Sequence, residues 1–145
     1  MPVFIRLGKL EDCEAVASLS NELGYVIELP QCLERLPGII EVRTHLFLVA
    51  EWEDGNVVGW AHAALPTKLL IGRHVELYGL IVGKHWRNRG IGEKLLARVE
   101  EWAREQGCKK VLVRSNVIRE RAHDFYKSRG YSEEKRQAFL VKTLG

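Results

Sequence analysis

Hydrophobic residues along the chain follow two kinds of spacing, one typical of β-strands and one typical of amphipathic helices. Runs rich in β-branched and aromatic residues predict strands at residues 3–7, 46–52, 56–65, 75–82, 110–114, 131–135 and 138–143. Apolar residues three or four positions apart predict helices at residues 10–23, 27–36, 90–106 and 119–129. The helix at 27–36 is the weakest, because Pro30 interrupts it and Pro37 ends it. The order β-α-α-β-β-β-α-β-α-β-β predicts an α/β (α+β) fold class, with helices covering a mixed sheet.

The chain of 145 residues has the size of one folded domain, so we expect residues 1–145 to form a single unit. Its 46% of hydrophobic residues is too high for a disordered chain. No apolar run approaches the length of a membrane span, and the N-terminus does not resemble a signal peptide. Cys13, Cys32 and Cys108 are widely spaced, which argues against disulfides and metal sites. We therefore expect a cytoplasmic protein with reduced thiols and no bound metal.

Charge is distributed unevenly along the chain, although the net charge is only +3. Residues 1–83 carry 6 Lys or Arg and 11 Asp or Glu, whereas residues 84–129 carry 13 and 6. Such asymmetry predicts an anionic partner for the basic part and a cationic partner for the acidic part. The alternative is a solvated surface without a partner.

A basic turn at residues 80–92, Leu-Ile-Val-Gly-Lys-His-Trp-Arg-Asn-Arg-Gly-Ile-Gly, joins a predicted strand to the strongest predicted helix. The first N–H groups of a helix have no intrahelical partner and carry partial positive charge. Glycines at positions 90 and 92 allow a phosphate to approach these groups closely. The pattern therefore predicts a phosphate or pyrophosphate site at this turn.

Two other interpretations of this turn stay open from the residues alone. Gly90 and Gly92 also suit a tight turn that binds nothing. Gly-x-Gly is also part of a dinucleotide-binding fingerprint, but Leu95 stands where that fingerprint has Gly or Ala. The strand that follows ends in Arg114 rather than in the acid of that fingerprint.

Two motifs resemble a known family. The pattern R-x-x-G-x-G at residues 87–92 resembles the acetyl-CoA signature of the GCN5-related N-acetyltransferases (GNAT family). The pattern A-x-x-F-Y-x-x-x-G-Y at residues 122–131 resembles the second signature of that family. The resemblance is clearest over residues 75–145 and looser in the N-terminal third. It implies a mixed, mostly antiparallel central sheet with helices on both faces, and an acetyl-CoA-dependent N-acetyltransferase.

The resemblance also implies which residues hold acetyl-CoA. Backbone groups of Leu80, Ile81 and Val82 would pair with the pantetheine arm as a neighbouring strand would. Ala122 and Phe125 would line the thioester end. The pyrophosphate would be held by the turn and the start of the helix, at Arg87, Asn88, Arg89, Gly90, Ile91, Gly92, Glu93 and Lys94.

One position departs from the family pattern. The family usually has an Asn seven residues before the Tyr of the second signature, where it contacts the pantetheine. Here that position is Arg119, and Asn116 lies three residues earlier. We favour Asn116 as the pantetheine contact; the alternative is that Asn116 only caps the helix that follows.

Two residues are candidates for proton transfer. The resemblance implies that Tyr126 protonates the departing thiolate; the alternative is a buried packing aromatic. Glu76 is the only acid on the strand before the first signature, so it is the candidate general base or else a charge-paired residue. Counting by twos places Tyr78 and Leu80 on its face, unless a bulge intervenes. No Cys is placed to act as a nucleophile, so we expect the amine to attack directly in a ternary complex.

The acceptor is predicted to be a cationic amine. Tyr25, Glu28, Glu34 and Glu41 lie in the acidic N-terminal region, where the family binds its acceptor. A polyamine-like or aminoglycoside-like compound fits, as does a lysine or N-terminal amine of a peptide. Nucleic acid and membranes are not expected partners, and a homodimer is expected by analogy with relatives. The alternative from another functional class is a CoA-binding sensor with little transferase activity.

Overall fold

The computed structural model describes residues 2–115 and 120–145 of the chain. These residues fall into two compact units, Met1–Arg114 and Ser115–Gly145. The first unit contains the sheet, and the second contains one helix followed by an extended segment. The single domain expected from chain length stays a prediction. In the described part of the chain, no helix is both long and apolar enough to cross a membrane.

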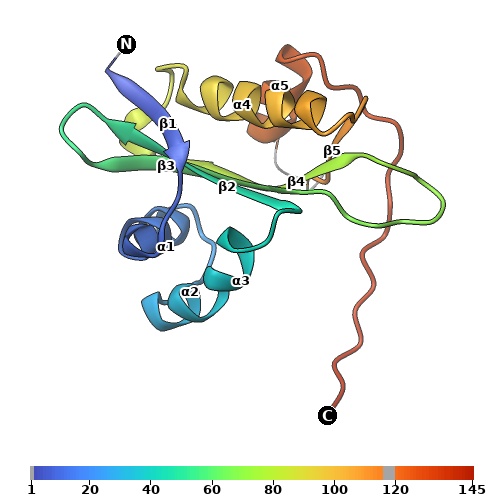
Figure 1. Ribbon diagram of the computed structural model, residues 1–145, viewed down its shortest axis with the longest axis horizontal. Helices are drawn as coiled ribbons and strands as arrows, with labels where there is room; N and C mark the ends of the chain where they lie inside the picture. The colour runs from blue at the N-terminus through green and yellow to red at the C-terminus, as the bar shows by residue number, and fades with distance from the viewer. Residues whose placement is uncertain (1, 116–119) are drawn as a thin grey trace. The chain divides into compact units, whose positions relative to one another are not determined.

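The sheet of the first unit has five strands, which are β1 (Val3–Leu7), β2 (His45–Trp52), β3 (Val57–Ala64), β4 (Val75–Val82) and β5 (Val111–Val113). They lie side by side in chain order, as Figure 1 shows. The pairs from β1 to β4 are antiparallel, and β5 runs parallel to β4. This arrangement confirms the predicted mixed, mostly antiparallel sheet.

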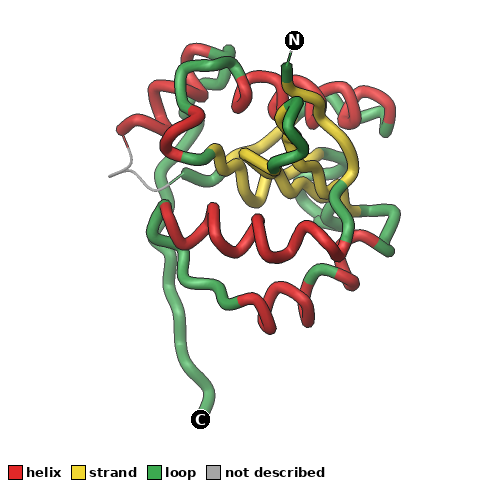
Figure 2. The backbone as a smooth tube through the Cα atoms, turned by 90° about the vertical axis from the view of Figure 1, so that its left-hand side faces the viewer, coloured by secondary structure: helices red, strands yellow, loops and turns green. Residues whose placement is uncertain are grey.

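Helices cover both faces of this sheet (Figures 1 and 2). One face carries α1 (Cys13–Glu22), α2 (Leu29–Arg35) and α3 (Pro37–Ile40), and the other carries α4 (Ile91–Glu105). The apolar stripe predicted for α4 is buried as expected, because it faces the sheet and each side chain there leaves water. Its members are Ile91, Leu95, Leu96, Val99, Trp102 and Ala103.

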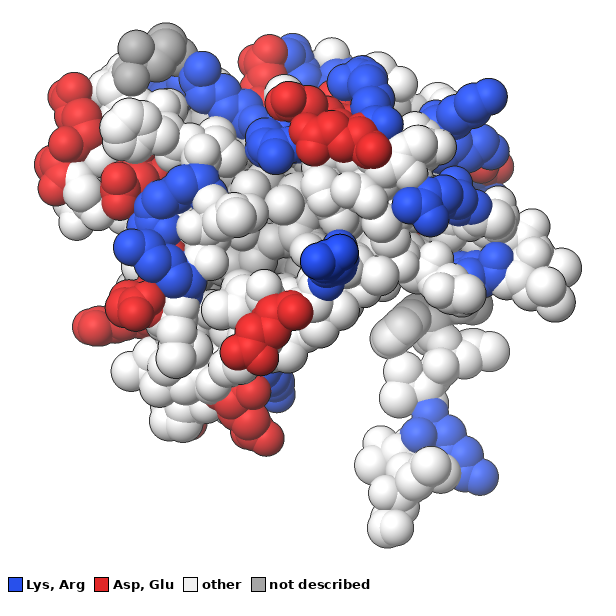
Figure 3. Space-filling view, viewed as in Figure 1, with Lys and Arg blue, Asp and Glu red and all other residues white. Residues whose placement is uncertain are grey.

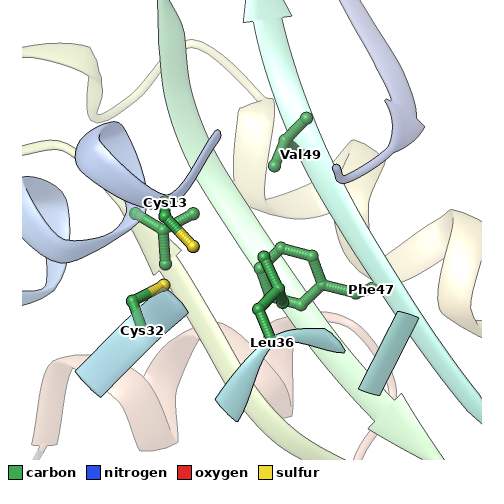
Figure 4. Packing of buried hydrophobic residues seen from close by; sticks show 6 residues of the cluster. Cys13, Cys32, Leu36, Phe47 and Val49 are labelled. Carbon is green, nitrogen blue, oxygen red and sulfur yellow. The ribbon is translucent and has the colours of Figure 1, made fainter. Parts of the chain in front are cut away.

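The core between the sheet and α1–α3 includes six buried side chains (Figure 4), which are Cys13, Val16, Cys32, Leu36, Phe47 and Val49. Cys13 on α1 and Cys32 on α2 point toward each other in this view. Both are free thiols, and so is the buried Cys108. Burial, reinforced by Cys32 and Asp12, raises the pKa of Cys13 to about 12. The cysteines therefore act as small apolar core groups, as the sequence predicted.

Two prolines lie at the starts of helices, and one of them differs from the sequence prediction. α2 begins at Leu29, so Pro30 lies in its first turn instead of interrupting it. α2 ends at Arg35, before Pro37 as predicted, and Pro37 is also the first residue of α3. Proline is tolerated in a first turn because the missing N–H would have no intrahelical acceptor there. Both prolines therefore start helices.

The second unit has one helix among its described residues, α5 (Glu120–Ser128). The strands predicted at 131–135 and 138–143 are wrong, since the structure has no regular element in residues 131–145. A strand persists only where a neighbour supplies hydrogen bonds, and an isolated hairpin is marginal in water. Phe139, Leu140 and Val141 are accordingly exposed. Local residue preference alone was a poor guide to these strands.

Candidate active site

The edge of β4 that faces β5 is paired at three of its eight residues and open over the rest. β5 pairs with residues 75–77 of β4. From Tyr78 to Val82, no strand of the described ranges 2–115 and 120–145 pairs with this edge. The open stretch is about 13 Å long at the rise of a β-strand. An extended ligand can pair there as an added strand would, and Leu80, Ile81 and Val82 all lie within it.

A β-bulge marks the start of the open edge. The register between β3 and β4 shifts at Tyr78, which has no partner in β3. Beyond the bulge Leu80 pairs with Ala61, whereas before it Glu76 pairs with Ala64. Ala61 and Ala64 are three residues apart on one strand, so they and their partners face opposite sides of the sheet. The bulge therefore separates Leu80 from the face of Glu76, which counting by twos had joined.

The phosphate turn, residues 87–90, connects this edge to α4. A short 3-10 helix at Lys84–Trp86 leads into it, and Asn88 and Gly90 have left-handed backbones with φ of 62° and 76°. Gly90 is the residue before α4, and its carbonyl accepts from the N–H of Lys94 at 3.1 Å. The N–H groups at the start of α4 have no intrahelical acceptor and lie at its positive end. Their number and direction suit a phosphate.

A pair of tryptophans fixes one cation beside this turn. The guanidinium of Arg89 lies over the rings of Trp52 and Trp86, 5.5 Å and 4.9 Å from their centroids. The two rings are 4.6 Å apart. Such cation–π contacts hold a charge without neutralising it. The phosphate turn therefore combines helix N–H groups with a positioned positive side chain, and the sequence had not singled out either tryptophan.

Glu76 is 2% exposed, and cations hold its carboxylate. Nζ of Lys68 lies 3.0 Å from Oε1, and Arg114 donates a hydrogen bond to the same oxygen. Burial alone raises the pKa of Glu76, but the hydrogen bonds from Arg114 and Lys68 outweigh burial and lower it. A proton on this carboxylate would weaken both of these ion pairs. These contacts favour the charge-paired interpretation of Glu76, and its role as general base stays a prediction.

The charge of Glu76 is expected to stabilise the fold in a pH-dependent way. Because its folded pKa lies below the ordinary 4.5, its contribution is complete above that pH and is lost as pH falls through the lowered value. Glu76→Gln should therefore lower the free energy of unfolding by about 2 kcal/mol at pH 7. Urea unfolding at pH 7 and at decreasing pH measures this, and the difference from wild type should shrink below pH 4.5.

A matched control for this prediction is Glu101→Gln. Glu101 lies 4.0 Å from Arg98 on α4, and its side chain is 65% exposed. Such surface pairs add little to stability, so this variant should unfold like wild type. Equal losses in the two variants, or a loss for Glu76→Gln that does not change with pH, would contradict the assignment.

Three side chains that the sequence did not bring together form a cluster on the sheet face that carries α1–α3. Nδ1 of His45 on β2 lies 2.8 Å from Nε2 of His62 on β3. The ring of Tyr78, the bulge residue of β4, lies edge-on to His62 with centroids 5.2 Å apart. No local pattern brings the pair together, because a register shift between Ala50 and Glu51 is needed to place His62 opposite Phe47 and near His45. We name these three residues the histidine cluster.

The second unit holds the residues of the second signature. Ala122, Phe125 and Tyr126 lie on α5, and all three are partly buried. The ring of Tyr126 packs against Phe125 at 5.2 Å and against Tyr131 at 5.7 Å. Asn116 and Arg119 lie outside the described residues.

The glycine of this signature has a structural reason. Gly130 has φ of 92°, a left-handed backbone that favours glycine. Its N–H donates to the carbonyl of Lys127 at 3.1 Å, and the N–H of Tyr131 donates to the carbonyl of Tyr126 at 3.0 Å. These two bonds form a Schellman motif that ends α5. Gly130 and Tyr131 thus fix the last turn of the helix, which carries Tyr126.

Comparison with known proteins decides the family. A model described as "Acetyltransferase (GNAT) family" matches residues 13–131, which is most of the chain. The chain belongs to this family. The predicted family membership and the predicted enzyme class, an acetyl-CoA-dependent acyltransferase, are thereby confirmed.

Relatives of this GNAT protein include two with assigned acceptors. It is 30% identical to an aminoglycoside N(6')-acetyltransferase type 1 of Stenotrophomonas maltophilia, over 90% of this chain and 88% of that one. It is 28% identical to the thialysine N-epsilon-acetyltransferase of Bos taurus, over 88% of this chain and 83% of that one. Among solved structures, the aminoglycoside acetyltransferase AAC(6')-Iy bound to CoA-S-monomethyl-acetylneamine has a TM-score of 0.86 at 21% identity, and the match covers 98% and 99% of the two chains. That likeness confirms the predicted GNAT fold.

Across residues 2–115 and 120–145, no group of three His, Cys, Asp or Glu is arranged to hold a metal.

Proposed function

We propose that this GNAT protein transfers the acetyl group of acetyl-CoA to a primary amine by direct attack in a ternary complex. The observation that carries the proposal is the open edge of β4 ending at the phosphate turn, within one unit. The pantetheine arm would pair with Leu80, Ile81 and Val82, and the pyrophosphate would lie on the N–H groups at the start of α4. Arg87 and Arg89 supply positive charge at the same end.

The reaction needs a neutral amine, a polarised carbonyl and a stable leaving group. A lysine-like amine with a pKa near 10.4 is only about 0.04% neutral at pH 7, so the protein has to accept a proton. A backbone N–H near Leu80 or Ile81 would polarise the thioester carbonyl. The amine nitrogen attacks the carbonyl carbon, the C–S bond breaks, and Tyr126 protonates the CoA thiolate. Ala122 and Phe125 would line the thioester end.

The acceptor class we propose is a small polycationic amine of the aminoglycoside kind. Acidic side chains (red in Figure 3) gather at the lower left of the face shown, where Figure 1 places α1, α2 and α3. Glu14, Glu28, Glu34 and Glu41 are exposed in this region. Negative charge there would attract a polycation. The aminoglycoside relatives support the same class.

A thiol-release assay tests this function. Purified protein and acetyl-CoA are mixed with neamine, spermidine or a lysine-containing peptide, and free CoA thiol is followed over time. We expect saturable release with neamine. Release with spermidine or the peptide but not with neamine would overturn the acceptor class. Binding of acetyl-CoA without release on any acceptor would overturn the transferase and support a CoA-binding sensor.

Location and assembly are separate inferences. We infer that the protein acts in the cytoplasm, from its reduced thiols, and that it forms a homodimer, by analogy with its family. Neither nucleic acid nor a membrane is part of the proposal. Sedimentation of the purified protein measures the oligomeric state directly.

A further inference from the structure

The histidine cluster lies where the acceptor amine would meet the thioester. Tyr78 is the bulge residue at which the open edge of β4 begins, and its side chain is 53% exposed. His62 is in contact with Tyr78 on one side and with Phe47 of the core on another, with ring centroids 5.2 Å and 6.3 Å apart. The cluster therefore reaches from the exposed start of the open edge of β4 to the core.

The two histidines are arranged to share a proton. Their rings are stacked with centroids 5.1 Å apart, and one nitrogen of each ring takes part in the 2.8 Å hydrogen bond. Burial, and then the charge of His45, lowers the pKa of His62 to about 4. A proton that reaches His62 at neutral pH is therefore held poorly there.

Other ionisable groups around the cluster are distant or already engaged. α3, packed next to β2, has the sequence Pro-Gly-Ile-Ile and carries no ionisable side chain. On β4, the carboxylate of Glu76 is held by Lys68 and Arg114. Glu22 at the end of α1 accepts from the N–H of Lys84 at 2.5 Å. The other ionisable side chains of α1 and α2 are the buried thiols of Cys13 and Cys32 and the exposed groups of Glu14, Glu34 and Arg35.

We propose that His62 and His45 form the proton relay that deprotonates the acceptor amine, with Tyr78 placing that amine at the bulge. This inference rests on the proposed transferase function. The acceptor ammonium gives a proton to Nδ1 of His62, while the Nε2 proton of His62 passes to Nδ1 of His45. The positive charge then resides on His45, and the neutral amine attacks the thioester. After attack the nitrogen loses its second proton through solvent to the Tyr126 phenolate, which has given its own proton to the CoA thiolate, so the one net proton released is the one on His45.

The histidine pair and Glu76 are competing candidates for the base that deprotonates the acceptor amine. Lys68 and Arg114 both bind Oε1 of Glu76, so a proton there would weaken two ion pairs, whereas the relay ends on the imidazole at the first position of β2. The two hypotheses differ in their pH dependence. A variant that lacks the true base should regain its rate as the pH rises, because the amine then loses its proton to solvent without a base.

The test compares His45→Gln, His62→Gln and Glu76→Gln with wild type and with the control His85→Gln, using neamine from pH 6.5 to 10. His85 is exposed in the 3-10 helix before the phosphate turn. We expect kcat/KM to fall about 100-fold at pH 7 in both cluster variants. The deficit should shrink about tenfold per pH unit toward the pKa of the amine. Glu76→Gln and His85→Gln should keep the wild-type profile shape, and calorimetric binding of acetyl-CoA should be unchanged in all variants.

Each outcome supports or overturns the relay. If kcat/KM of the two cluster variants equals that of wild type, or is lowered by the same factor at every pH, the relay is overturned. If only Glu76→Gln loses kcat/KM at pH 7 and regains it at high pH, the base is Glu76. If His62→Gln does not fold, as judged by circular dichroism, the His45→Gln profile decides by itself. A wild-type protein that releases no thiol with any amine would instead overturn the proposed function, which separates the two failures.

Discussion

Tyr126→Phe is expected to lower kcat about 100-fold with the acceptor while leaving the Kd for acetyl-CoA within about twofold. The phenol would give its proton to the departing thiolate, and phenylalanine keeps the ring but has no proton to give. Phenylalanine keeps the ring that packs against Phe125 and Tyr131, and backbone hydrogen bonds close the end of α5, so the helix end should be preserved. Steady-state thiol release and calorimetric titration measure the two quantities separately.

Tyr131→Phe is the matched control. Tyr131 packs against Tyr126 at 5.7 Å, and its backbone N–H, which a substitution retains, closes the end of α5. Loss of its hydroxyl should therefore leave kcat near the wild-type value. An unchanged rate in Tyr126→Phe would remove the general-acid role and leave Tyr126 as a packing aromatic.

Gly90→Ala is expected to weaken acetyl-CoA binding about tenfold. A Cβ at Gly90 would meet no atom within 4 Å, so the substitution causes no clash, but its φ of 76° is unfavourable for alanine. The strain costs about 1 kcal/mol and is relieved by turning the peptide away from the left-handed conformation. That movement redirects the N–H groups at the start of α4, which the pyrophosphate would need. Calorimetry with acetyl-CoA measures the change.

Gly107→Ala provides the same strain at the other end of the same helix. Its φ is 74°, and a Cβ there also has nothing within 4 Å. The two variants should lose similar stability in urea unfolding. If Gly107→Ala weakens acetyl-CoA as much as Gly90→Ala does, the effect comes from helix stability, and the phosphate turn is not the binding site.

The sequence predicted best those elements whose pattern is local. The strand β4 was predicted with its bounds, and α4 was predicted because its apolar stripe repeats with helical spacing. Pro30 was misread because the same residue that breaks a helix interior also starts one. The strands predicted after α5 failed because a strand depends on a partner that its own residues do not specify.

In the candidate site, too, the features formed by neighbouring residues were predictable, and those formed by distant segments were not. The phosphate turn was predictable, since all of it lies within a few residues and its glycines and arginines form a motif. The histidine cluster was not, because β2, β3 and β4 have to pair before its members meet. The bulge at Tyr78 also shifts the register by one residue, which period-two counting does not anticipate. Likewise, Glu76 was proposed from its strand position, but Lys68 and Arg114 come from elsewhere in the chain.

Calorimetric titration of acetyl-CoA into the wild-type protein tests the central claim most directly, with NADP as a control that also carries a pyrophosphate. The open edge of β4 and the phosphate turn predict saturable binding of one acetyl-CoA per chain and no comparable binding of NADP. Absence of acetyl-CoA binding, or equal binding of NADP, would contradict the assignment of this edge and turn to the pantetheine and pyrophosphate of acetyl-CoA.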